Sequence, residues 1–201
     1  MDKIIFIGGS NQNGPGLAIY KMLQKDFDVV QIGREELYSD KYLELIDYFK
    51  PKHIIISTYH KCQKEIDSIN IRDITTSIES KVMPLLRVSQ NLNKELSSVL
   101  VFSGVLSDFI ELKSLPTTLT NVCIEKMIEY LSVKFIGKIR FNCIKPGRVD
   151  INRVRNQNPY LVPTENLYST LKMIIQNESI NGTSIVIDKG YRLNQKQEFY
   201  R

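Results

Sequence analysis

The sequence has no long apolar run, few cysteines and no concentration of basic residues, and each of these shortages excludes a class of function. No apolar stretch approaches the ~20 residues that cross a membrane, so we expect no membrane span. Because the first residues already have the pattern of a strand, we expect no signal peptide. Cys62, Cys123 and Cys143 lack metal-ligand spacing. We therefore expect no metal site, and reduced, buried thiols in a cytoplasmic protein.

The basic residues give a net charge of +5 but are spread along the chain. A nucleic-acid-binding module typically has clustered Lys and Arg with interleaved aromatic residues. We therefore expect neither a nucleic acid nor a membrane as partner, whereas a mild basic excess is compatible with a phosphorylated cofactor. The 201 residues have the length of one domain, which buries roughly 70% of the unfolded surface.

The segment over residues 3–20 has the pattern of a strand, a glycine-rich turn and a helix. Its glycines have the spacing Gly9-x4-Gly14-x-Gly16, and glycine allows a tight turn and the close approach of a large anion. The N–H groups of the first helical turn, at the positive end of the helix dipole, can bind a pyrophosphate. Many helices also begin after glycine for structural reasons alone, so both interpretations stay open. The candidate cofactor-binding residues of this loop are Gly9, Ser10, Asn13, Gly14 and Gly16.

Two further strand ends carry candidate cofactor contacts. The second strand, over residues 28–34, ends at Gly33-Arg34. An acidic residue at this place binds the ribose 2′-hydroxyl of NAD, whereas an arginine accommodates the 2′-phosphate of NADP. Arg34 favours NADP, although Glu35 and Glu36 directly follow it. Ser57 and Thr58 end a third buried strand, and the carboxyl ends of parallel strands border the ligand crevice.

Strand-like and helix-like segments alternate along the whole chain. Strands are predicted at residues 3–7, 28–34, 52–60, 99–104, 139–144 and 182–188, and a polar tail follows the last one. Helices are predicted from Pro15, over 42–49, over 66–96 with a break near Met83, over 117–135 with Thr117 or Thr118 as cap, and over 164–177. This alternation predicts a parallel sheet with helices on both faces. We expect one doubly wound α/β domain over residues 1–201.

Two blocks near the carboxyl terminus complete a family resemblance. Residues 137–149 are GKIRFNCIKPGRV and residues 181–191 are NGTSIVIDKGY. Together with the glycine loop, they resemble the short-chain dehydrogenase/reductases, which carry I-R-x-N-x-I-x-P-G-x-V at the sixth strand and close with T-G-x-x-I-x-V-D-G-G-Y. The resemblance implies a seven-stranded, mostly parallel Rossmann sheet, NAD(P) across its switch point, and a homodimer or homotetramer built through two long helices. It implies cofactor contacts at Pro146, Gly147 and Arg148.

The residues that do chemistry in this family are replaced here. The family uses a tyrosine as acid/base, a lysine four residues later, a serine on the fifth strand and an asparagine on the preceding helix. The matching positions hold Thr117, Asn121, Gly104 (with Ser103 beside it) and Lys81. An aliphatic alcohol has too high a pKa to replace a phenol, and the Asn121 amide carries no charge that could tune it. The chain resembles a shortened subgroup that lacks the usual catalytic residues.

Several functions stay open. In an oxidoreductase with a rebuilt site, a desolvated Lys81 would act as acid or base, with Ser103 or Thr117 bonded to the oxygen of a small substrate and with Ser103 and Asn121 bordering the cofactor. Alternatively, Lys81 makes a structural bond to strand-end carbonyls or pairs with Glu79. The chain would then be a non-catalytic cofactor-binding module, such as a redox sensor or scaffold, or an inert scaffold.

The segment over residues 148–163, where the family has its substrate lid, carries three arginines. They are Arg148, Arg153 and Arg155. They favour either an anionic small substrate or, more commonly, a solvated surface.

Overall fold

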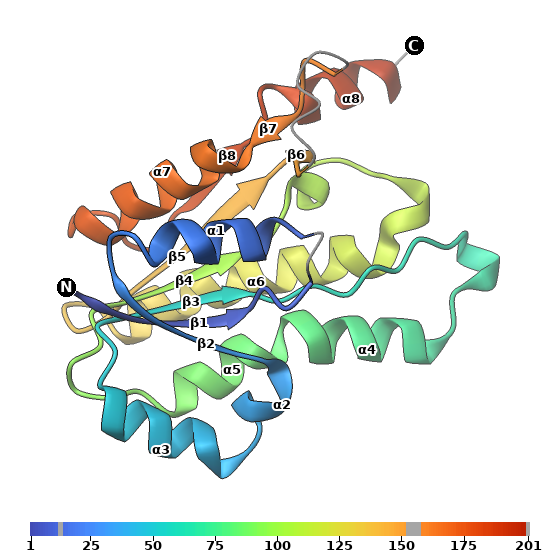
Figure 1. Ribbon diagram of the computed structural model, residues 1–201. Coiled ribbons are helices and arrows are strands. Elements are labelled where there is room, and N and C mark those ends of the chain that lie inside the picture. The colour runs from blue at the N-terminus through green and yellow to red at the C-terminus, as the bar shows by residue number, and fades with distance from the viewer. Residues whose placement is uncertain (12–13, 152–157, 200–201) are drawn as a thin grey trace.

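The computed structural model describes residues 1–11, 14–151 and 158–199, and its strands and helices alternate along the chain (Figure 1). Six parallel strands form the central sheet in the order β2-β1-β3-β4-β5-β8. They are β1 (Lys3–Gly8), β2 (Asp28–Ile32), β3 (His53–Ser57), β4 (Ser98–Phe102), β5 (Arg140–Pro146) and β8 (Ser184–Ile187). A separate two-stranded sheet pairs β6 (Val149–Asp150) with β7 (Val162–Pro163).

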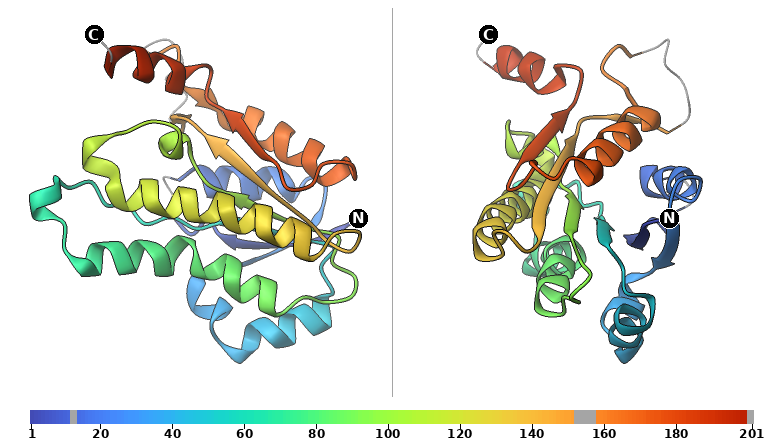
Figure 2. Two further views of the ribbon diagram at one scale, coloured as in Figure 1. Left: turned by 180° about the vertical axis from the view of Figure 1, so that it is seen from behind. Right: turned by 90° about the vertical axis from the view of Figure 1, so that its left-hand side faces the viewer.

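Helices cover both faces of the central sheet (Figure 2). On one face lie α1 (Pro15–Leu23) and α7 (Thr164–Gln176). On the other lie α2 (Arg34–Leu37), α3 (Asp40–Phe49), α4 (Ile71–Lys81), α5 (Met83–Gln90) and α6 (Leu115–Lys134). The last described helix, α8 (Tyr191–Phe199), follows β8. Among the described helices, none is long and apolar enough to cross a membrane.

Strand β1 shows why the sheet separates two cores. Its Ile4 and Phe6 pack with α1 and α7, whereas Ile5 and Ile7 pack with the helices of the opposite face. All four side chains are fully buried. Because a central parallel strand is covered on both faces, its sequence is a continuous apolar run rather than an alternating one.

The central sheet has six strands and not the seven that the family resemblance implies. The stretch between β2 and β3, residues 33–52, holds the two short helices α2 and α3 and then Pro51. In the described part of the chain, no strand pairs with the outer edge of β2. The chain therefore turns back to the sheet after two helices, and β2 is left as an edge strand.

Several element boundaries also differ from the sequence prediction: among them, β3 ends at Ser57 rather than at residue 60, and α5 ends at Gln90 rather than at residue 96. The predicted polar tail forms α8, because the Asp188 carboxylate accepts the N–H groups of Gly190 and Arg192, each at 3.0 Å, and so caps its first turn. Thr117 lies inside α6 and does not cap it, because Pro116 already occupies the first turn of a helix that begins at Leu115. The predicted break near Met83 is confirmed, although α4 begins only at Ile71.

The strand order reverses between β1 and β3, because the chain adds β2 on one side of β1 and then crosses to the other side. Gly8 and Ser57, the last residues of β1 and β3, are register partners at this point. Ligands of doubly wound folds bind outside the carboxyl ends of the strands, at such a switch point. The fold therefore places the glycine turn and Ser57 at the expected crevice.

Candidate functional site

The turn between β1 and α1 requires glycine for the packing of the chain itself. Gly8 has φ +104°, and a Cβ atom there would lie 2.5 Å from the carbonyl oxygen of Ser57. A Cβ atom at Gly16 would lie 3.0 Å from both the Gly9 Cα and the Ser57 Oγ. The contact between the ends of β1 and β3 therefore explains Gly8, and the close approach of α1 to the strand ends explains Gly16, in both cases without a ligand.

Two other features of this crevice fit a nucleotide. The N-cap residue of α1 is Gly14, which has no side chain to cap the N–H groups of the first turn. The Thr58 side chain, only 6% exposed, holds a hydroxyl without a hydrogen-bond partner in the described part of the chain. An unpaired buried hydroxyl is unfavourable by about 1–3 kcal/mol, so a ligand that bonds to it would remove this cost. Asn13 lies outside the described residues, and Ser10 is exposed.

Arg34 lies where the sequence places it, directly after β2, but its side chain is already engaged. It is the first residue of α2, and its guanidinium donates a hydrogen bond to the buried Ser80 hydroxyl on α4. The Glu36 carboxylate accepts the Gly33 N–H at 2.6 Å. The structure therefore places both a cation and an anion at the end of β2.

Lys81 ends α4 with its ammonium group held between β4 and α6. Its Nζ donates to the carbonyl oxygen of Ser103 at 3.2 Å and to the side-chain oxygen of Asn121. The Asn121 amide nitrogen donates to the Gly104 carbonyl at 3.1 Å, which turns its oxygen toward Lys81. Lys81 is only 5% exposed, and this burial lowers its pKa from 10.5 to about 8.

The structure brings together three of the four predicted catalytic residues, because Lys81 bonds to both Ser103 and Asn121. The bond from Lys81 to the Ser103 carbonyl, at the end of β4, is the contact expected if Lys81 has a structural role. The Ser103 hydroxyl points toward α6, where it bonds to the Glu125 carboxylate at 3.2 Å. Thr117 lies one helical turn before Asn121 and is 9% exposed; among the described residues, no hydrogen bond joins its hydroxyl to Lys81.

Sequence reasoning missed a partly buried ion cluster beside this group. Lys145 is 5% exposed, and its Nζ contacts Glu125 at 2.9 Å and Asp108 at 2.5 Å. Burial opposes the charge of Lys145, but the two carboxylates outweigh it and raise the pKa. A lysine inside the apolar run that precedes Pro146 was the available signal, because a buried lysine needs a partner of opposite charge.

The end of β5 meets the end of β8. A Cβ atom at Gly147 would lie 2.8 Å from the Asp188 Cβ, so this glycine allows the two segments to touch. Arg148 follows, and its guanidinium lies 4.8 Å from the centre of the Tyr191 ring on α8. Arg153 and Arg155 lie outside the described residues.

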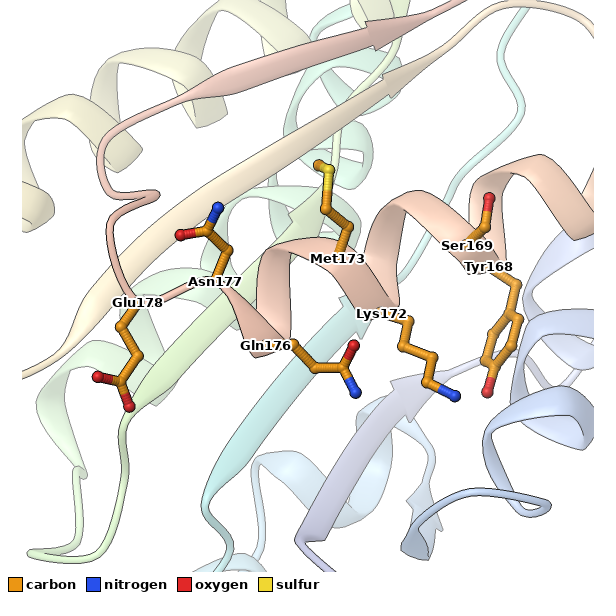
Figure 3. Close-up of a pocket in the computed structure, with 7 residues that line it drawn as sticks. All are labelled: Tyr168, Ser169, Lys172, Met173, Gln176, Asn177 and Glu178. Atoms are coloured by element: carbon orange, nitrogen blue, oxygen red, sulfur yellow. The ribbon is translucent and has the colours of Figure 1, made fainter.

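A surface pocket lies away from these residues, along α7 (Figure 3). It is lined by Tyr168, Ser169, Lys172, Met173, Gln176, Asn177 and Glu178. Tyr168 and Lys172 both bond to the Asp26 carboxylate, which ties α7 to the turn after α1. No predicted site residue lines this pocket.

The strand order, the switch point and the helices on both faces define a Rossmann-like α/β fold. No protein-family model and no curated protein matches the sequence. Solved structures match over nearly the whole chain, so the chain has the fold of the short-chain dehydrogenase/reductases.

Three of these structures illustrate the match. An apo SCOR enzyme from Clostridium thermocellum has a TM-score of 0.82 and 13% identity, covering 98% of this chain and 93% of its own. A short-chain dehydrogenase/reductase from Serratia marcescens has a TM-score of 0.79 and 14% identity, covering 95% and 97%. A small-chain dehydrogenase in complex with NADPH has a TM-score of 0.77 and 18% identity, covering 96% and 99%.

The lowered pKa of Lys81 predicts a pH-dependent contribution to stability. Between the folded value of about 8 and the ordinary 10.5, the unfolded chain binds more protons, so stability rises with pH. From pH 7.5 to 10, we expect the free energy of unfolding of the parent to gain about 2–3 kcal/mol over that of Lys81→Met. Urea unfolding at both pH values measures this difference. The exposed Lys126→Met is the control, and parallel pH profiles for parent and Lys81→Met would contradict the assignment.

Proposed function

We propose that this chain is a member of the short-chain dehydrogenase/reductase superfamily that binds NADP in preference to NAD and acts as an oxidoreductase on a small carbonyl or alcohol. The observation that carries the proposal is the position of Lys81. Its buried ammonium is held at the end of β4. The neighbouring strand β3 ends next to the Thr58 hydroxyl, which has no partner among the residues that the structure describes. The proposed nucleotide site, at the end of β3, and the Lys81 ammonium, at the end of β4, thus lie at neighbouring strands.

The cofactor would be held by the residues of the switch point. The glycine turn and the first-turn N–H groups of α1 would bind the pyrophosphate, and Thr58 would bond to the nucleotide. Arg34 would leave Ser80 and bind the 2′-phosphate. Beyond β4, the Pro146–Arg148 segment would border the nicotinamide, which supplies or accepts the hydride when it is bound.

Lys81 would move the proton that the family moves with tyrosine. An ammonium has three N–H donors, of which Ser103 and Asn121 occupy two, so the third can donate to a substrate oxygen. A pKa of about 8 lets the group give up and regain a proton near neutral pH. Because the Ser103 hydroxyl is bonded to Glu125, Thr117 is the better candidate for the second bond to the substrate oxygen.

A specific observation also favours the alternative, a cofactor-binding module without turnover that serves as a redox sensor or scaffold. The Lys81 ammonium is anchored to two protein acceptors and is 5% exposed. The same contacts would stabilise the junction of α4, β4 and α6 without any substrate. Turnover therefore decides between the two functions.

We further propose a cytoplasmic homodimer or homotetramer with reduced thiols. The prediction that all three thiols are buried is wrong for Cys123, which is exposed on α6. The outer face of α6, one of the two long helices, carries exposed apolar side chains: Leu119 and Val122 at 42%, Tyr130 at 65% and Val133 at 72%. Their spacing puts Leu119 and Val122, and likewise Tyr130 and Val133, on one side of the helix. Such a stripe is typical of a surface that a partner covers.

The Arg34 assignment predicts a change in cofactor preference. Arg34→Ala removes the cation that faces the 2′-phosphate, so we expect NADPH affinity to fall at least about tenfold. NADH affinity should stay within about twofold, since NADH lacks this phosphate. Calorimetric titration of both cofactors measures this, with the exposed Lys41→Ala as control. An equal loss for NADPH and NADH would contradict the assignment.

The Lys81 assignment predicts a loss of turnover. With a panel of small aldehydes and ketones, Lys81→Met should lower kcat for NADPH oxidation at least about 100-fold, while NADPH affinity stays close to that of the parent. Activity that survives the substitution would exclude the role. Tight cofactor binding by a parent that turns over no substrate would favour the sensor or scaffold, and a parent that binds neither cofactor would be an inert scaffold.

The association proposal predicts that a charge on α6 dissociates the assembly. Val133→Asp places a carboxylate in the apolar stripe and should shift the protein to monomers at micromolar concentration. Analytical ultracentrifugation of parent and variant measures the state. Lys41→Asp is the control, because position 41 lies on another helix, α3, and is already charged and exposed. A monomeric parent would rule out the interface.

A further inference from the structure

The partly buried carboxylate of Glu125 lies one helical turn after Asn121 on α6, and three donors converge on it. Its Oε1 accepts hydrogen bonds from the Ser107 hydroxyl at 2.5 Å and the Ser103 hydroxyl at 3.2 Å. Its Oε2 accepts a bond from the Lys145 ammonium at 2.9 Å. A carboxylate that accepts this many hydrogen bonds is held in one position.

The cluster fastens one segment of the chain at both ends. Ser103 begins the segment directly after β4, and Asp108 ends it after the short 3₁₀ turn Val105–Ser107. Glu125 binds its first residue, and Lys145 on β5 binds both Glu125 and Asp108. Arg192 on α8 contacts Asp108 from the outside at 3.5 Å. The path of residues 103–108 is therefore set by α6 and β5 together.

Ser103 connects this cluster to Lys81. Its carbonyl oxygen accepts the hydrogen bond from the Lys81 ammonium, and its hydroxyl donates to the Glu125 carboxylate. Glu125 thus holds a residue that in turn holds Lys81. It does so from the side of α6 that also carries Asn121, the second acceptor of the ammonium.

We propose that Glu125 is a positioning residue for the Lys81 site: it fixes the Ser103 carbonyl against the Lys81 ammonium and provides the negative charge that faces this ammonium. The inference rests on the proposed role of Lys81 in proton transfer, because a purely structural lysine has no need of a set charge state. Glu125 acts through Ser103 and through its charge, and it does not touch the substrate.

The surroundings of Lys81 explain why this charge is needed. Cys143 on β5 and Glu125 on α6 both favour the ammonium form, against burial. Two cations are also part of these surroundings. Lys145 is paired with Glu125, and Arg34 bonds to Ser80, the residue before Lys81. Burial raises the pKa of the Cys143 thiol to about 11, so this thiol is neutral at pH 7–8. Among the described groups that favour the ammonium, Glu125 is therefore the one that is charged in this range.

A titration of Lys81 in Glu125→Gln tests the charge. Glutamine keeps an oxygen that can accept the serine hydroxyls, but it loses the charge, so we expect the Lys81 pKa to fall by about half a unit to one unit. The pKa is read by NMR of lysine labelled with ¹³C at Cε, with the signal assigned by its loss in Lys81→Arg. Glu129→Gln, on the next turn of α6 in an exposed ion pair with Lys126, is the control and should leave the pKa unchanged. An unchanged Lys81 pKa in Glu125→Gln would overturn the inference.

A second variant tests the positioning and keeps the ion pair, in case Glu125→Gln does not fold. Glu125→Asp retains the charge but shortens the reach, so we expect the Lys81 pKa to stay within about 0.3 units of the parent while amide hydrogen exchange of residues 103–108 becomes at least about threefold faster. Exchange at the parent rate would overturn the positioning role. Neither measurement needs cofactor, substrate or turnover, so failure of this inference is distinguishable from failure of the proposed oxidoreductase activity.

Discussion

The site depends on the burial of one ammonium group. Taking a lysine charge out of water is unfavourable by several kcal/mol unless hydrogen-bond acceptors replace the lost hydration. For Lys81, these acceptors are the Ser103 carbonyl at the end of β4 and the Asn121 amide oxygen on α6. The need to satisfy this charge therefore joins α4, β4 and α6 at one point. It also sets the chemistry available there, since a group with a pKa of about 8 can exchange protons where an aliphatic alcohol cannot.

The proposed nucleotide site and the Lys81 group are supported by different physical observations. Gly8 is required by its positive φ and by the contact of β1 with the end of β3, and Gly16 by the contact of α1 with the strand ends. The glycine pattern alone therefore does not distinguish a cofactor site from a structural turn. Thr58 is a separate observation, because its buried hydroxyl at the end of β3 has no partner among the described residues. A polar group left unsatisfied at a switch point is the stronger pointer to a ligand.

Much of the fold could be predicted from the sequence, because its signals are local. The apolar runs, the glycine turn and the break near Met83 depend on residues close in sequence. The number of strands could not be predicted from the family resemblance, because helices occupy the stretch before Pro51. The contacts of Lys81 and the Glu125–Lys145 pair depend on how α4, α6 and β5 pack side by side, which spacing along the chain does not encode. For Lys81, the sequence analysis already offered a strand-end carbonyl as a partner, whereas the partners of Lys145, Glu125 and Asp108, could not be predicted.

The position of β2 at the end of the sheet has a consequence for solubility. One side of this strand pairs with β1, and its other side meets no described strand. An open strand edge is a template for pairing with other chains, which leads to aggregation. Here the strand is only five residues long, begins at the exposed Asp28 and passes within two residues into α2, while its Gln31 side chain bonds to the Gly8 carbonyl. The short length and the polar start leave too little flat edge for a foreign strand to extend the sheet.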